Sequence, residues 1–180
     1  MTRTQTKESH RAQLEVPRFE DSRALLIAGL RSRYAGQTMN NIPAQWQRFV
    51  PHIGRVPGQI GHLVYGVCWQ ADDGQGIEYL SGVEVSGFSG LPGQFTVVSI
   101  PAHRYAVFPH REHVSKLRDT VDAVFHKWLP ESGLEAGADP ETPDFFERYT
   151  EEFNPRTGMG GMEVWVPVQS CVEAKAATAG

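Results

Sequence analysis

The sequence predicts an α+β fold made of two duplicated βαββ units with pseudo-two-fold symmetry, whose antiparallel sheets enclose a central groove. Three observations support this prediction. Strand-like and helical segments follow one another as strand, helix, strand, strand, and the same order then repeats. The tripeptide Arg-Tyr-Ala at 33–35 and again at 104–106 precedes a loop and a helix each time. The strands at 77–85 and 162–168, which close the two units, share a glutamate, an apolar residue two positions later and a valine five positions later.

Six segments are rich in Val, Ile, Tyr, Phe and Trp, the residues that are favoured in strands. An Asp-Gly pair at 73–74 predicts a tight hairpin between the second and third of them. The six strand-like segments are 23–35, 63–69, 77–85, 94–108, 144–153 and 162–168.

Two other segments have apolar residues at steps of three and four, the spacing that is typical of amphipathic helices. The first is 41–54, in which Pro51 is a point where the helix could break. The second is 114–133, where a stripe of apolar residues faces a stripe of charged ones. We therefore expect one helix in each unit.

The chain has 180 residues, which is enough for one domain with a substantial core. We expect a flexible N-terminal segment at 1–17 and a flexible tail at 170–180, because both ends are small and polar. The single domain then runs over 18–169, with halves at about 24–85 and 95–168.

The composition excludes several classes of protein. A formal net charge of -4 and a pI near 6.0 argue against direct binding of nucleic acid, which needs a basic surface. No segment approaches the roughly 20 apolar residues of a membrane helix, and the N-terminus has no apolar leader. The two cysteines, Cys68 and Cys171, are far apart and form no metal-binding or disulfide motif. We expect a cytoplasmic protein that contacts no membrane.

An acidic residue interrupts the hydrophobic strand at 162–168. Strand alternation places Val164, Val166 and Val168 on one face and Glu163 and Trp165 on the other. The valines are expected to pack beneath a helix, which turns Glu163 toward the groove. A carboxylate among apolar groups is unfavourable unless a cation or hydrogen-bond donors compensate for lost hydration. Such a site binds a cation or a proton.

Aromatic residues on neighbouring strands could complete a binding site around Glu163. Tyr65 and Trp69 share one face of their strand, and Tyr149 lies on the strand that pairs with that of Glu163. Aromatic rings attract organic cations, so these residues and Trp165 could form a cage around one. The alternative is that the aromatics are ordinary core and that Glu163 pairs with an arginine such as Arg148 or lies at a hydrated edge of the sheet. Glu84 is a further acid that could line the other wall of the groove, although a position on the surface is the simpler expectation.

No pattern of a metal or cofactor site is present. Three histidines, His103, His110 and His113, lie close together in sequence, but their spacing does not match a helical metal motif. The glycine-rich segments do not lie between a strand and a helix as a phosphate loop requires. We expect neither a metal nor a cofactor.

Five motifs taken in order resemble the effector-binding domain of AraC-type bacterial regulators, the GyrI-like or gyrase-inhibitor-like superfamily. They are VYGVCW, YLSGVEV, IPAHRYAVFPHREHVSKLRDTVDAVFHKWLPESG, PDFFERYTEEFNPRTG and MEVWVPV. The resemblance covers about 24–168 and implies duplicated βαββ units around a ligand groove. It also implies that a glutamate on the last strand, here Glu163, lies at the centre of that groove among aromatics.

The resemblance implies three possible functions. Members of the family bind small hydrophobic, amphiphilic or cationic molecules, which would place Glu163, Trp165, Tyr65, Trp69 and Tyr149 around the ligand. Some relatives hydrolyse electrophilic cyclopropane-containing compounds, for which Glu163 would be the catalytic residue. A third branch inhibits DNA gyrase or assists transcription regulators. No helix-turn-helix precedes the first strand in this sequence. We therefore expect a stand-alone binding protein and leave enzymatic activity open.

Overall fold

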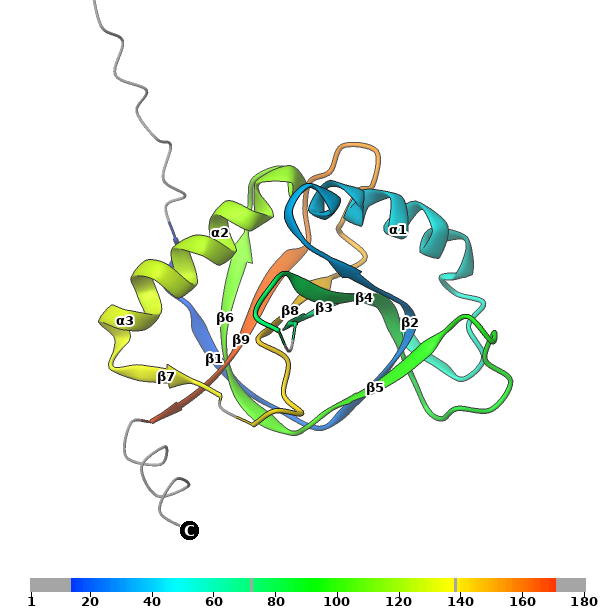
Figure 1. Ribbon diagram of the computed structural model, residues 1–180, viewed down its shortest axis with the longest axis horizontal. Helices are drawn as coiled ribbons and strands as arrows, with labels where there is room; N and C mark the ends of the chain where they lie inside the picture. Colours follow the sequence, from blue (N-terminus) through cyan, green and yellow to red (C-terminus); the bar gives the residue numbers. More distant parts are fainter. Residues whose placement is uncertain (1–13, 72, 138, 171–180) are drawn as a thin grey trace, which may run out of the picture.

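A nine-stranded sheet in which every pairing is antiparallel forms the body of the described chain (Figure 1). The computed structural model describes residues 14–71, 73–137 and 139–170. The strand order is β1-β6-β9-β8-β3-β4-β2-β5, and β7 pairs with β9 outside this path. The strands are β1 (Arg18–Ser22), β2 (Leu25–Tyr34), β3 (Gln59–Gln70), β4 (Ile77–Val85), β5 (Thr96–Ile100), β6 (His103–His110), β7 (Leu134–Ala136), β8 (Phe145–Tyr149) and β9 (Met162–Ser170).

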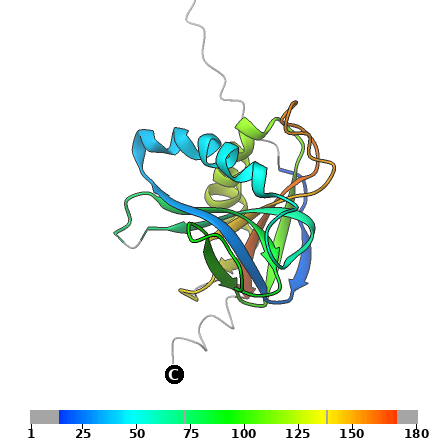
Figure 2. The same ribbon diagram turned by 90° about the vertical axis from the view of Figure 1, so that its right-hand side faces the viewer.

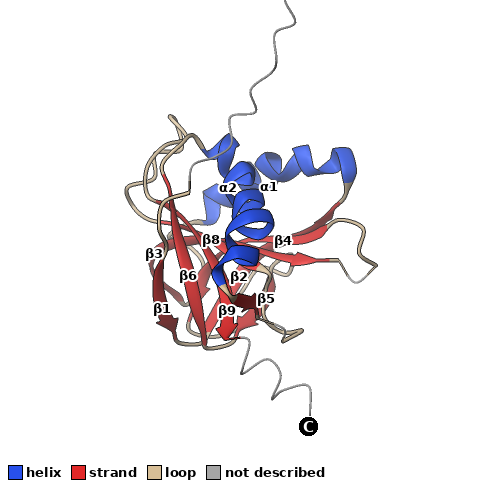
Figure 3. Ribbon diagram, turned by 90° about the vertical axis from the view of Figure 1, so that its left-hand side faces the viewer, coloured by secondary structure: helices blue, strands red, loops and turns tan. Residues whose placement is uncertain are grey.

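Both predicted helices are present, and they lie on the same side of the sheet (Figures 2 and 3). The first is α1, which ends before Pro51, and a 3₁₀ turn follows it. The second contains a π-helical turn immediately before Pro130. Proline has no N–H to donate and its ring crowds the preceding turn, which accounts for the widening. The helical bounds are α1 (Ile42–Phe49), α2 (Leu117–Ala123), the π turn (Val124–Trp128) and α3 (Leu129–Ser132).

The two halves of the chain join through β3 and β8. These strands pair from Val64 opposite Tyr149 to Cys68 opposite Phe145. The prediction of separate sheets facing each other is therefore wrong, because pairing β3 with β8 satisfies two edges that would otherwise expose backbone groups. The predicted order is present as β2, α1, β3, β4 and as β6, α2, β8, β9. A symmetry axis between the halves stays a prediction.

Two further details differ from the sequence prediction. The segment 94–108 forms two strands, β5 and β6, because Pro101 between them has no N–H for the ladder. Strands β1 and β7 were not predicted, since both are short and β1 is largely polar. The hairpin between β3 and β4 is present as predicted.

No helix in the described ranges is long and apolar enough to cross a membrane.

The predicted flexible ends fall largely outside the described residues, which exclude 1–13 and 171–180. Cys171 lies there too, whereas Cys68 is a buried free thiol in β3. Ser170, which was assigned to the tail, is the last residue of β9.

The sheet is strongly curved, and its two faces pack differently (Figure 1). The helices cover the convex face, where Phe49 of α1 and Leu117 of α2 contact the core. On the concave face, side chains from seven strands pack against one another, and no helical residue of the described chain belongs to that cluster. Its buried members are Leu25, Ile27, Tyr65, Val67, Leu80, Ile100, Tyr105, Val107, Phe146 and Trp165.

A buried glutamine attaches α1 to the convex face. The amide nitrogen of Gln45 donates to the Leu30 carbonyl and to the Ser81 hydroxyl, each at 2.8 Å. Its oxygen accepts from the Tyr34 hydroxyl at 2.7 Å. Since a buried amide is stable only when it is paired, these bonds fix the position of α1 on β2 and β4.

Candidate functional site

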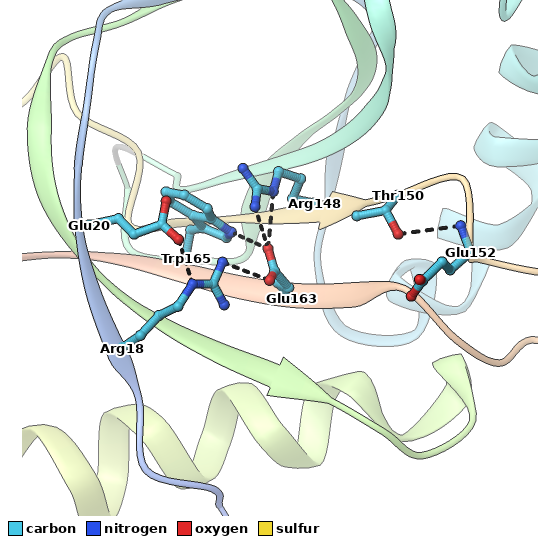
Figure 4. Close-up of polar contacts among 7 residues, drawn as sticks. All are labelled: Arg18, Glu20, Arg148, Thr150, Glu152, Glu163 and Trp165. Carbon is cyan, nitrogen blue, oxygen red and sulfur yellow. Dashed lines mark hydrogen bonds and ion pairs between the residues drawn. The ribbon is translucent and has the colours of Figure 1, made fainter.

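The carboxylate of Glu163 is held by three side chains on the concave face (Figure 4). Arg148, directly opposite on β8, donates a hydrogen bond from Nε to Oε2 at 3.0 Å, and one of its terminal nitrogens forms an ion pair with the same oxygen at 2.8 Å. The indole N–H of Trp165 donates to the same oxygen at 3.0 Å. Arg18, from edge strand β1, lies 2.7 Å from Oε1 and also pairs with Glu20. The predicted alternative, in which Glu163 pairs with Arg148, is confirmed.

These donors keep Glu163 ionised. Burial is the largest influence and raises the pKa of this half-buried carboxyl. The hydrogen bond from Trp165 and the charges of Arg148 and Arg18 outweigh it, so the pKa lies below its ordinary value. A carboxyl that stays ionised at neutral pH cannot act as a general acid there. The ionised carboxylate therefore pairs with positively charged groups, here the guanidinium groups of Arg148 and Arg18.

An aromatic wall stands beside the carboxylate. The ring of Trp165 stacks on Phe146 with centroids 5.3 Å apart and planes 18° apart. The guanidinium of Arg148 lies 4.2 Å from the Trp165 ring centroid, and that of Arg18 lies 5.7 Å from it. Tyr65 extends the wall, with its ring 5.9 Å from Phe146. The rings and the carboxylate thus already hold two cationic side chains.

The structure brings three of the five predicted residues together. Glu163, Trp165 and Tyr65 lie on the concave face, as strand alternation predicted. Trp69 shares that face, but it lies four residues beyond Tyr65, about 13 Å along the strand. There it packs against Arg31, whose guanidinium is 5.0 Å from the ring centroid. Trp69 is therefore outside the contacts of Glu163.

Tyr149 lies on the other face, so the expectation that it surrounds Glu163 is wrong. Arg148 is opposite Glu163, which makes Tyr149 opposite Met162. Opposite residues on paired strands share a face, and successive residues alternate. Tyr149 and Met162 accordingly belong to the cluster beneath the helices, with the valines at 164, 166 and 168.

A second buried carboxylate lies on that convex face. Glu147 Oε2 accepts from the Tyr79 hydroxyl at 2.6 Å and from the Tyr149 hydroxyl at 2.8 Å. The Trp46 indole of α1 donates to Tyr79 at 3.1 Å. Burial raises the pKa of Glu147 to about 7, although the two tyrosine hydrogen bonds lower it. The sheet separates this group from Glu163.

Several residues of the concave face were missed in the sequence. Phe146 could have been found by alternation from Arg148, whereas Arg18 gives no local signal because β1 is brought to the site by long-range pairing. The expectation that Glu84 lies on the surface is wrong, since its residue is only 6% exposed and it forms an ion pair of 2.5 Å with Arg23.

An open hollow of about 720 Å³ lies away from this carboxylate, near the ends of β1, β6 and β9. It is shallow and rimmed by charged groups, and Glu163 does not line it. The lining residues of the hollow are Phe19, Asp21, His103, Arg104, Leu134, Val168, Gln169 and Ser170.

Comparisons with known proteins give the same fold. The chain is 28% identical over 156 residues to the transcriptional regulator BrlR of Pseudomonas aeruginosa, and the match covers 84% of this chain. It spans 54%, about half, of the length of that regulator.

Two solved structures are similar in fold. SAV2435 bound to tetraphenylphosphonium has a TM-score of 0.68 at 20% identity, covering 88% of this chain and 96% of that one. The EcmrR C-terminal domain has a TM-score of 0.62 at 12% identity, covering 87% and 98%. The sequence profile of one family matches residues 15–169, nearly the whole described chain. On that match, the protein belongs to the GyrI-like small molecule binding domain family.

Proposed function

We propose that this chain binds a small amphiphilic organic cation on its concave face, against Glu163 and Trp165. The observation that carries the proposal is the ionised, half-buried carboxylate beside a stacked indole that already holds the Arg148 guanidinium at 4.2 Å. A lipophilic cation uses the same two attractions, ring quadrupole and carboxylate charge. Tetraphenylphosphonium, the cation bound to SAV2435, has this chemistry.

Arg18 is the side chain that the ligand displaces. The charges of Arg18, Arg148, Glu20 and Glu163 sum to zero, so a further cation is favoured only when a guanidinium leaves. Arg18 is the more exposed of the two, 42% against 23% for Arg148, and it comes from an edge strand. The Nε of Arg18 is hydrogen-bonded to Glu20, so Arg18 keeps one ionic partner after it leaves Oε1 of Glu163.

The ligand would occupy a groove that opens when Arg18 leaves, between the two βαββ halves. In this proposal the chain acts as an effector-binding unit with no nucleic-acid surface of its own. For the hydrolase alternative, the lowered pKa of Glu163 leaves this carboxylate the role of a general base and not that of a general acid. No contact in the described residues favours gyrase inhibition over ligand binding.

The experiment is calorimetric titration of tetraphenylphosphonium and of neutral triphenylphosphine oxide. Glu163→Gln should lower the affinity for the cation by about tenfold or more and change the affinity for the neutral compound little, because the substitution removes only the charge. Arg18→Gln should strengthen cation binding several-fold. Arg118→Gln, which removes an exposed charge on α2, is the matched control. Equal losses for the cation and the neutral compound in Glu163→Gln would contradict the proposal.

A further inference from the structure

Tyr105 belongs to the aromatic wall that Trp165, Phe146 and Tyr65 form on the concave face. It lies in β6, opposite Pro167 of β9, and its residue is 0% exposed. Its ring centroid is 5.7 Å from that of Trp165 and 5.2 Å from that of Phe146. Tyr105 is therefore in direct contact with the rings that would receive the ligand.

The hydroxyl of Tyr105 is buried and has no hydrogen-bond partner among the described residues. Three other buried tyrosines of this chain donate to side chains. Tyr34 donates to Gln45 at 2.7 Å, and Tyr79 and Tyr149 both donate to Glu147. Phenylalanine would fill the same space without the desolvation cost of an unpaired hydroxyl.

Tyr105 remains a neutral donor at physiological pH, because burial raises its pKa to about 12. A neutral phenol donates readily to carbonyl, ether and hydroxyl oxygens. Tyr105 lies opposite Pro167, four residues along β9 from Glu163, so the acceptor would be carried on the part of the ligand that extends past Trp165, away from the cationic centre held by Glu163.

We propose that Tyr105 determines ligand specificity by donating a hydrogen bond to an oxygen acceptor on the bound organic cation. This inference rests on the proposed function and narrows its ligand class to cations that carry a carbonyl, ether or hydroxyl oxygen. The unpaired hydroxyl, its complete burial and its contact with Trp165 and Phe146 support it together.

Two phosphonium cations of equal charge and similar shape test the proposal. (4-Acetylphenyl)triphenylphosphonium carries a carbonyl where the (4-isopropylphenyl) analogue carries a methyl group. The unaltered protein should bind the acetyl compound about tenfold more tightly. In Tyr105→Phe the ratio of the two affinities should fall to about one. An equal ratio in both proteins would overturn the proposal.

Failure of the proposed function looks different from failure of this inference. If neither cation binds the unaltered protein, both proposals are overturned. If both bind equally well and Glu163→Gln weakens both, cation binding stands and the role of Tyr105 is overturned.

Stability without ligand gives a second, independent readout. Tyr105→Phe should raise the Tm of the ligand-free protein by about 2–4 °C, because an unpaired buried hydroxyl is removed. Tyr34→Phe, which breaks the bond to Gln45, should lower it. A decrease for Tyr105→Phe comparable to that of Tyr34→Phe would mean that the hydroxyl has an internal partner, and would overturn the proposal.

Discussion

Arg148 and Glu163 lie directly opposite each other on β8 and β9, joined by a hydrogen bond of 3.0 Å and an ion-pair contact of 2.8 Å to the same carboxylate oxygen. Because opposite residues of paired strands share a face, this pair also positions Trp165, whose indole donates to the same oxygen. The arrangement leaves Oε1 to Arg18 alone among the described side chains. Each oxygen of Glu163 thus has its own arginine, one from the sheet centre and one from its edge.

Arg148→Met should raise the pKa of Glu163, because a positive charge that favours the ionised form is removed while burial remains. Cation binding requires the carboxylate, so its affinity should begin to fall at a higher pH in the variant than in the unaltered protein. Titration of tetraphenylphosphonium between about pH 4 and pH 7 measures this. Arg118→Met on α2 is the control for charge loss. Identical pH profiles for Arg148→Met and the unaltered protein would contradict the assignment.

Glu147 should make the protein less stable as pH rises. Its folded pKa is about 7, above the ordinary 4.5, so the folded state binds the proton more tightly than the unfolded state. Stability from this group is therefore greatest below about pH 4.5, falls between about 4.5 and 7, and levels off above. The full difference is on the order of 3 kcal/mol. Glu163, with a lowered pKa, acts in the opposite direction and only in acid.

Glu147→Gln should flatten this dependence, because an amide accepts from Tyr79 and Tyr149 but does not titrate. Urea unfolding at about pH 5 and about pH 8 compares the two proteins. Glu112→Gln changes an exposed carboxylate and serves as control. The change in unfolding free energy between the two pH values is measured for each protein. The prediction is wrong if this change is the same for the unaltered protein and for Glu147→Gln.

Gly66 provides the space in which Glu147 and Tyr79 meet. A Cβ at this position would overlap the Tyr79 hydroxyl and the Glu147 carboxylate, and would lie 2.9 Å from Tyr79 Cζ. Gly66→Ala should therefore lower the free energy of unfolding by about 1 to 3 kcal/mol. Gly93→Ala has nothing within 4 Å of its Cβ and should have little effect. Urea titration measures the free energy of unfolding of both variants. Equal losses of stability in the two variants would contradict the predicted crowding at Gly66.

Local alternation predicted the two faces of each strand, but the sequence did not show how the strands pair. It correctly divided β9 into valines and the Glu163–Trp165 pair. Alternation did not predict the face of Tyr149. That face depends on which residue of β8 lies opposite Glu163, and this register is set by strand pairing. Arg18 was missed for the same reason, since β1 is far from β9 in sequence.

The helices were predictable because their apolar spacing is local, whereas the single continuous sheet was not. Pairing of β3 with β8 joins segments about 80 residues apart, and no periodic pattern specifies such a partner. Burial of Glu84 also depends on pairing, because its register opposite Ile27 of β2 places it on the concave face.

Gln45→Leu should destabilise the protein by about 2 to 4 kcal/mol, because four polar groups lose their hydrogen bonds to the buried amide. These are the Tyr34 hydroxyl at 2.7 Å, the Leu30 carbonyl and Ser81 hydroxyl at 2.8 Å each, and the Tyr79 carbonyl at 3.3 Å. The leucine side chain is not smaller than that of glutamine, so no cavity forms. The loss of stability comes from the buried polar groups that lose their hydrogen bonds. Gln47→Leu changes an exposed glutamine on the same helix and should have little effect. Equal unfolding free energies for the two variants would show that Gln45 does not hold α1 to the sheet.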